Sequence, residues 1–158
     1  MKKITLFLVA GAMLLVMAAG IAVAQVAQDI IVGTNGPDTL VGSPGPDVIQ
    51  GRGGADTISG LAARDTLVGG RGGDTIDGGS DSDSLNGKRG RDIINDTARN
   101  DTDRVIGGRG GDTINVADDD TRDVVRCGKG NDTVTYDVIG TLSDEIDDAT
   151  CEVQIIAT

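Results

Sequence analysis

The chain has 158 residues, with 25 acidic against 14 basic side chains, 25 glycines, two cysteines and no histidine or tryptophan. The absence of histidine excludes an imidazole base, an imidazole metal ligand and a histidine-containing nucleophile triad. A formal charge of −11 and the near absence of aromatic residues argue against nucleic acid as a partner and favour cations.

Residues 1–24 have the features of a secretory signal peptide. Two lysines precede an apolar run over residues 4–22, and the small residues of 22–24 form a cleavage site before Gln25. The apolar run approaches the ~20 residues that span a bilayer, so an uncleaved membrane anchor is the alternative, and only then is a membrane a partner. In both cases the rest of the chain is expected to be secreted or at the cell surface.

A repeat begins at Gly33. Seven consecutive nine-residue units cover residues 33–95, and five units of nine to twelve residues continue to residue 147. Every unit has an aspartate three residues before its end, which is the sixth place of a nine-residue unit, and an aliphatic residue two positions later. The aspartates are Asp38, Asp47, Asp56, Asp65, Asp74, Asp83, Asp92, Asp103, Asp112, Asp123, Asp132 and Asp144. The aliphatic residues are Leu40, Ile49, Ile58, Leu67, Ile76, Leu85, Ile94, Val105, Ile114, Val125, Val134 and Ile146.

Each unit combines a turn with a short strand. Its glycine-rich half tolerates positive φ, and its Asp-Thr-Ile half favours β-structure with one aliphatic side chain pointing inward. One such unit buries almost nothing, so the units must stack. Two units per coil place every second unit in register, which predicts two parallel ladders, about six coils and two edges of turns. The twelve aspartates then alternate between these edges.

The units GGRGGDTID at 69–77 and GGRGGDTIN at 107–115 resemble the RTX, or haemolysin-type, calcium-binding repeat GGxGxDxUx. This resemblance implies an all-β fold, a right-handed parallel β-roll (β-solenoid), with Ca²⁺ held between neighbouring coils by aspartate carboxylates and glycine-turn carbonyls. The implied aspartate ligands are Asp38, Asp56, Asp74, Asp92, Asp112 and Asp132 on one edge and Asp47, Asp65 and Asp83 on the other. The implied turn glycines are Gly33, Gly51, Gly69, Gly70, Gly72, Gly107, Gly108, Gly110, Gly128 and Gly130. Asp103, Asp123 and Asp144 are weaker candidates because their turns are longer and lose the motif.

The chemistry of the residues agrees with calcium. Ca²⁺ takes six to eight oxygen ligands in a forgiving geometry, whereas zinc would require histidine or paired thiolates. Six intact turns on one edge and three on the other predict about five to seven ions. Neighbouring carboxylates ~5 Å apart repel each other by about 3 kcal/mol at an effective dielectric near 20, so we expect folding to be coupled to calcium binding.

Three further features are the long turns, the arginines of the glycine turns and the two cysteines. The long turns 95–103 and 116–123 either chelate through their side chains or form solvated bulges. The arginines of the glycine turns, such as Arg52, Arg71, Arg89 and Arg109, occupy variable places and are expected to reduce self-repulsion. Cys127 and Cys151 predict a disulfide in an exported chain, since a redox pair would need a CxxC spacing.

The predicted organisation is a signal segment (1–24), an N-terminal cap (25–32), the roll (33–147) and a disulfide-tied C-terminal cap (148–158). The predicted function is that of a secreted, calcium-binding structural or interaction module without enzymatic activity. One alternative is a calcium-dependent, polysaccharide-active enzyme on a β-helix. The other is a surface-binding or ice-binding protein that uses an outward row of threonines, namely Thr39, Thr57, Thr75, Thr113 and Thr133.

Overall fold

The computed structural model describes residues 28–96, 102–117, 122–139, 142–143, 145–146 and 151–156. All regular structure in these ranges is β-strand, and they contain no helix that could cross a membrane. The predicted signal segment and Asp144 lie outside the described residues.

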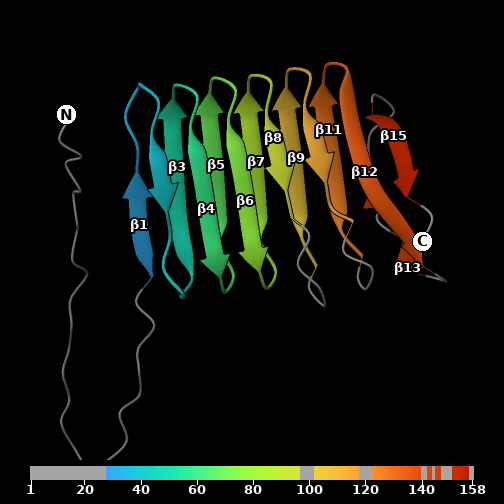
Figure 1. The fold of residues 1–158 in the computed structure, drawn as a ribbon, viewed down its shortest axis with the longest axis horizontal. Coiled ribbons are helices and arrows are strands. Elements are labelled where there is room, and N and C mark those ends of the chain that lie inside the picture. Colours follow the sequence, from blue (N-terminus) through green and yellow to red (C-terminus); the bar gives the residue numbers. More distant parts are fainter. Residues whose placement is uncertain are drawn as a thin grey trace, which may run out of the picture.

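The strands form two sheets that lie against each other (Figure 1). The first sheet has the order β1 (Asp29–Val32), β3 (Asp47–Gly53), β5 (Thr66–Arg71), β7 (Ser84–Arg89), β9 (Arg104–Arg109), β11 (Val124–Lys129) and β14 (Glu145–Ile146). The second has the order β2 (Thr39–Val41), β4 (Thr57–Ala62), β6 (Thr75–Ser80), β8 (Ile93–Asn95), β10 (Thr113–Asn115), β12 (Asp132–Ile139) and β13 (Leu142–Ser143), with β15 (Cys151–Ile156) also paired to β12. Successive strands alternate between the sheets, which confirms the predicted parallel β-roll of about six coils.

Turns join the two sheets along two edges. The first edge contains the turns that lead from the first sheet to the second, such as 51–56 between β3 and β4, and lies at the top of Figure 1. The second edge contains the returning turns, such as 60–65 between β4 and β5. Each aspartate of the repeat therefore lies beside the aspartate 18 or 20 residues further along the chain.

The core between the sheets is a double row of aliphatic side chains. Ile58 pairs in register with Ile76, and Ile49 with Leu67, as the nine-residue period predicts. Ten of the twelve predicted aliphatic residues are at most 1% exposed, whereas Leu40 and Ile146, at the ends of the rows, are only partly buried. The outward residues of the second sheet form the predicted threonine row, which Ile93 interrupts.

Additional strands cover both ends of the roll. Strand β1 belongs to the segment expected to be a cap, and it pairs with β3 so that Asp29 lies opposite Asp47. At the other end, β15 pairs with β12, and a disulfide joins Cys151 to Cys127 with a Cα–Cα distance of 5.7 Å. The predicted disulfide is thus present, and it fixes the terminal strand to the last turn of the first edge.

Removing this disulfide is expected to destabilise the roll. For the 24-residue separation between the cysteines, loop closure contributes about 3 kcal/mol in the chain-entropy model. A protein with both Cys127→Ala and Cys151→Ala should lose about that free energy of unfolding in urea with calcium present. Reduced wild-type protein is the control and should show the same loss, while a loss below about 1 kcal/mol in both would contradict the closing role.

Candidate metal centre

Each edge of the roll holds a ladder of buried aspartates. The backbone amide of each aspartate donates a hydrogen bond to Oδ1 of the aspartate one coil further along, at 2.7 to 3.0 Å. The first-edge ladder contains Asp38, Asp56, Asp74, Asp92, Asp112 and Asp132. The second-edge ladder contains Asp29, Asp47, Asp65, Asp83, Asp103 and Asp123. The structure therefore brings together every predicted aspartate that it describes.

The second carboxylate oxygen has a different environment. On six ladder residues Oδ2 is buried and accepts no hydrogen bond from the described residues, and these are Asp56, Asp65, Asp74, Asp92, Asp112 and Asp132. An ionised carboxylate oxygen that is buried without a partner is costly, because it loses its hydration and gains nothing in exchange. A cation beside these oxygens would supply the missing partner.

The first glycine of a turn lies directly against the carboxylate of that turn and a carbonyl oxygen of the neighbouring coil. A Cβ atom added to Gly51 would meet Asp56 Oδ2 together with the carbonyl oxygen of Gly69, which lies one coil away, at 2.5 Å. A Cβ added to Gly107 would lie 2.7 Å from Asp112 Oδ2 and 2.6 Å from the Cys127 carbonyl oxygen. Glycine is required here because a side chain would fill the place where carboxylate and carbonyl oxygens converge.

Glycines at the second and fourth places of the turns have positive φ angles, which allow neighbouring coils to approach closely. Gly70 and Gly72 have φ angles of 121° and 122°, in the left-handed region. Their faces lie directly against the carbonyl groups of Arg52 and Gly54 in the preceding coil. The same contacts recur at Gly108, Gly110, Gly128 and Gly130, so the predicted turn glycines form stacked rows of backbone oxygen atoms.

Burial dominates the electrostatics of the ladders. It raises the pKa of Asp92 to about 7 and that of Asp65 to about 6, together with a smaller effect of neighbouring carboxylates. The hydrogen bond that each of these carboxylates accepts from a backbone amide lowers the pKa by less. The pKa values of Asp56, Asp74 and Asp112 are raised for the same first cause. Without metal these side chains therefore resist ionisation, as expected of ligands that need a cation.

The oxygen-only donor set, the orphaned Oδ2 atoms and the carbonyl oxygens that converge beside them together fit a hard divalent cation such as Ca²⁺. The family of RTX calcium-binding nonapeptide repeats, in four copies, matches residues 32–67 and 59–94. Residues 32–94 carry RTX calcium-binding repeats. Comparisons with curated proteins and with solved structures found no match. RTX repeats bind calcium in general.

The first RTX turn of each edge differs from the others. Asp38 Oδ2 accepts hydrogen bonds from the backbone amide of Thr34, at 2.5 Å, and from its hydroxyl, at 3.0 Å. The carboxylate of Asp47 accepts corresponding hydrogen bonds from Ser43. These outermost carboxylates are therefore satisfied within their own turns, which is a local alternative to a metal ligand.

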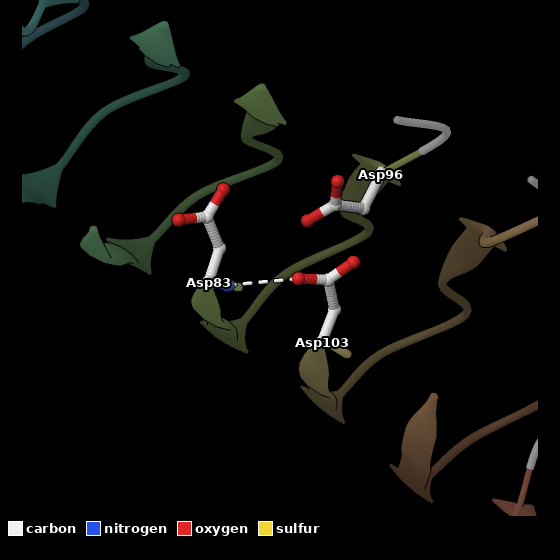
Figure 2. Close-up of side chains that lie close together, drawn as sticks. All are labelled: Asp83, Asp96 and Asp103. Carbon is white, nitrogen blue, oxygen red and sulfur yellow. Dashed lines mark hydrogen bonds between the residues drawn. The ribbon is translucent and has the colours of Figure 1, made fainter. Parts of the chain in front are cut away.

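A further carboxylate joins the second RTX edge at Asp96. Figure 2 shows the side chains of Asp83, Asp96 and Asp103 turned toward one another, and one ligand oxygen from each lies within 4.8 Å of the others. Asp96 is 1% exposed, so this part of the long turn 95–103 is buried rather than a solvated bulge. The three side chains can hold a cation together.

The sequence analysis did not identify Asp96 as a ligand, although a signal was present. Asp96 occupies the first place of an eleven-residue unit, where other units have glycine. The next unit of the second edge, 116–126, has Val116 at this place, with a fully buried side chain. An apolar side chain offers no ligand, so Val116 cannot add a third carboxylate beside Asp103 and Asp123 as Asp96 does beside Asp83 and Asp103. Of the last two aspartates predicted for the second edge, Asp123 belongs to the ladder, and Asp144 lies outside the described residues.

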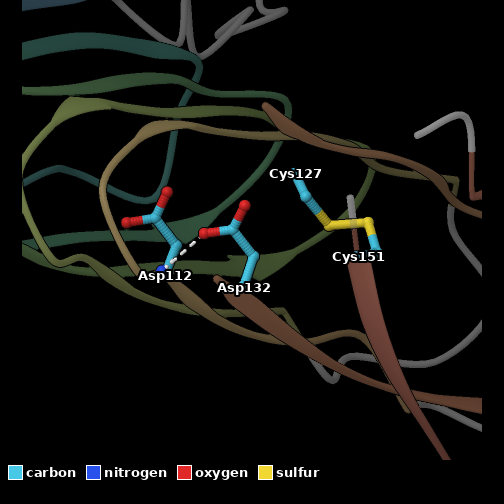
Figure 3. The surroundings of a disulfide bond; sticks show 4 residues. All are labelled: Asp112, Cys127, Asp132 and Cys151. Carbon is cyan, nitrogen blue, oxygen red and sulfur yellow. Dashed lines mark hydrogen bonds between the residues drawn. A yellow bond between two sulfur atoms is a disulfide. The ribbon is translucent and has the colours of Figure 1, made fainter. Parts of the chain in front are cut away.

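The first edge ends beside the disulfide. Figure 3 shows the hydrogen bond from the Asp112 amide to Asp132, at 2.8 Å, next to the Cys127–Cys151 pair. Cys127 takes the first place of the last turn, and its side chain is fully buried in the disulfide. The covalent link thus holds the last carboxylate of this RTX ladder close to its neighbour.

Restoring glycine at the first place of the long unit should remove one metal site. The substitution Asp96→Gly is expected to lower the number of calcium ions in a calorimetric titration by one, since only two of the three carboxylates remain. The matched control is Asp77→Asn, which removes an exposed carboxylate of a neighbouring unit. Unchanged stoichiometry in the Asp96→Gly protein would show that this cluster holds no ion.

The calcium-free protein should be more stable in acid than at neutral pH. Asp65 and Asp92 have raised pKa values in the folded chain, about 6 and about 7 against 3.8, so between these values the folded state binds more protons than the unfolded state. Stability then falls as the pH rises from about 4 to about 7. Circular dichroism in chelator should show more β-structure at pH near 4.5 than at pH near 8. Calcium affinity should change in the opposite sense, because protons compete for the same oxygens.

Proposed function

We propose that the chain is an exported structural or interaction module whose roll becomes rigid when calcium binds along both edges. The observation that carries the proposal is the row of buried aspartate oxygens without hydrogen-bond partners among the described residues, all but that of Asp132 lying against the first glycine of the same turn. First-edge turns 51–56 to 127–132 supply most of the binding sites, and the Asp83, Asp96 and Asp103 cluster supplies one on the second edge. Repeats of this family are typically structural rather than enzymatic.

Calorimetric titration of the disulfide-intact protein tests the metal proposal. Calcium should bind at several sites, whereas magnesium at the same concentration should bind weakly, because Mg²⁺ requires stricter octahedral geometry. The variant Asp92→Asn should lose calcium affinity, and the matched variant Asp77→Asn, which changes an exposed side chain, should not. Equal binding of the two metals, or unchanged affinity in the Asp92→Asn protein, would refute the proposal.

Export is the second part of the proposal. It is supported by the disulfide, because such bonds persist in oxidising compartments, and by the signal-like segment at residues 1–24. Calcium is abundant outside cells, so a chain that folds on binding calcium would become rigid after export. Fractionation of producing cells should recover the oxidised protein outside the cytoplasm, and a reduced cytoplasmic pool alone would contradict export.

Surface binding through the threonine row is a second candidate function, since one observation favours it. Thr39, Thr57 and Thr75 lie in strict register on a flat sheet face, followed after Ile93 by Thr113 and Thr133. A regular row of hydroxyl and methyl groups could order water. A thermal hysteresis assay tests this candidate, and absence of hysteresis at high protein concentration would exclude ice binding.

A further inference from the structure

Among the described residues, most acidic side chains are buried, whereas the basic side chains are exposed. Eleven aspartates are buried along the ladders and at Asp96. In contrast, every arginine and lysine in the described ranges is exposed. Much of the negative charge of the chain therefore lies inside the edges, where calcium would neutralise it. The formal charge of −11 does not describe the charge that a partner would contact at the surface. Besides reducing self-repulsion, the exposed turn arginines can therefore contact a partner.

Six of the exposed cations form a basic stripe along the first edge. They occupy the second and third places of its turns, and they are Arg52, Arg71, Lys88, Arg89, Arg109 and Lys129. None of the six first-edge turns has an acidic residue at these two places. Within the described part of the chain, no ion pair links a member of the stripe to a carboxylate. The stripe is thus an unneutralised line of positive charge.

The stripe is straight because strand pairing aligns it. Arg71 pairs in register with Arg89, Arg89 with Arg109, and Arg109 with Lys129. Neighbouring strands lie about 4.8 Å apart, so the stripe from β3 to β11 extends over about 19 Å. Like charges at this spacing repel one another, and an extended anion laid along the stripe would relieve that repulsion.

Two members of the stripe occupy strained backbone positions. Arg52 and Lys88 have φ angles of 76° and 74° at the second place, where Gly70, Gly108 and Gly128 stand in other coils. A non-glycine residue in this region costs about 1 kcal/mol or more. The second-edge turns 42–47, 60–65 and 78–83 form no comparable stripe, because they contain one basic and one acidic side chain outside the ladder. Positive charge is therefore concentrated on one edge despite a conformational cost.

We propose that the basic stripe binds a linear anionic polysaccharide. A polymer with a carboxylate or sulfate on successive sugars can contact the whole line, whereas a small anion would contact one or two cations. Nucleic acid is less suitable, since Phe7 and Tyr136 are the only aromatic residues for base stacking and the edge presents no element that enters a groove. The calcium dependence of binding rests on the proposed function, because ions beneath the stripe would neutralise the ladder carboxylates and make the edge more positive.

Binding to dextran sulfate, with uncharged dextran of equal length as the reference polymer, tests the stripe in calcium-containing buffer. The variant Arg71→Gln, Arg89→Gln, Arg109→Gln should bind dextran sulfate at least about tenfold more weakly, with a smaller dependence on salt. The control variant Arg64→Gln, Arg104→Gln, Arg122→Gln removes the same charge from elsewhere and should stay within about twofold of wild type. Calcium titration and circular dichroism of both variants should match those of the wild type.

Each other outcome overturns a defined part of the proposal. Equal losses in the two variants would show that overall charge, not the stripe, attracts the polymer. Single-stranded DNA of matched charge that binds as tightly as dextran sulfate would refute the polysaccharide assignment. Normal calcium uptake without binding of dextran sulfate would refute the stripe alone, whereas stripe-dependent binding without calcium uptake would refute the calcium proposal and leave the stripe standing.

Discussion

Chelation of calcium at neutral pH is expected to abolish most of the β-structure of the roll. Along each ladder, ionised carboxylates would lie one strand spacing apart, and each neighbouring pair would cost about 3 kcal/mol at an effective dielectric near 20. The core offers little compensation, because each unit buries a single aliphatic side chain. Since the stability of a domain is only about 5–15 kcal/mol, several such pairs suffice to unfold it.

Far-ultraviolet circular dichroism of the disulfide-intact protein in excess chelator measures this effect. The spectrum should change to that of an unfolded chain and return when calcium is added, whereas magnesium should restore it poorly. The same measurement at pH near 4.5 is the control. Protonated ladder carboxylates do not repel one another, so the protein should keep its β-structure there without metal. A full β-spectrum in chelator at pH 7.5 would contradict the coupling of folding to calcium.

The substitution Gly72→Ala should destabilise the calcium-loaded roll by about 3–5 kcal/mol. Gly72 has a φ of 122°, and an added methyl group would overlap the carbonyl oxygen of Gly54 in the preceding coil. Both the backbone conformation and the close approach of the coils require glycine here. Relief would require the coils to separate, which would also disperse the oxygen atoms that surround the metal.

The neighbouring coil provides a matched control in Gly53→Ala. An added Cβ at Gly53 would meet no atom closer than 3.7 Å, and the φ of this residue is not in the left-handed region. Urea unfolding in calcium should show a change of less than about 1 kcal/mol for the control. Similar stabilities of the two variants would indicate that the turn at Gly72 can relax, and that close coil stacking is not required there.

Much of the candidate site could be predicted because the repeat is local in sequence. The period places Asp74 beside Asp92 and Ile58 beside Ile76 once two units are assigned to each coil. Asp29 carried the same signal, since it lies nine residues before Asp38 and two before Ile31, but it was assigned to a cap. In the structure it is the first member of the second-edge ladder.

Other features depend on the register of residues that are distant in the chain. The first place of each unit turns inward, so Asp96 becomes a third carboxylate and Val116 becomes part of the core, although both lie in loops that read as polar. In the first coil, the carboxylates of Asp38 and Asp47 accept hydrogen bonds from Thr34 and Ser43. Composition could not reveal these differences, because they depend on which side chain faces the neighbouring coil.

The sequence alone determined the number of coils, the two edges and the identity of the inward aliphatic residues, because a nine-residue period leaves the backbone one way to bury them. The tertiary structure decided where the charge lies. Stacking encloses the aspartates between neighbouring coils and leaves the arginines and lysines on the rim, so that a chain with an acidic composition has a basic edge. The physical reason is that burial depends on contacts between residues 18 or 20 positions apart, which a count of charges does not contain.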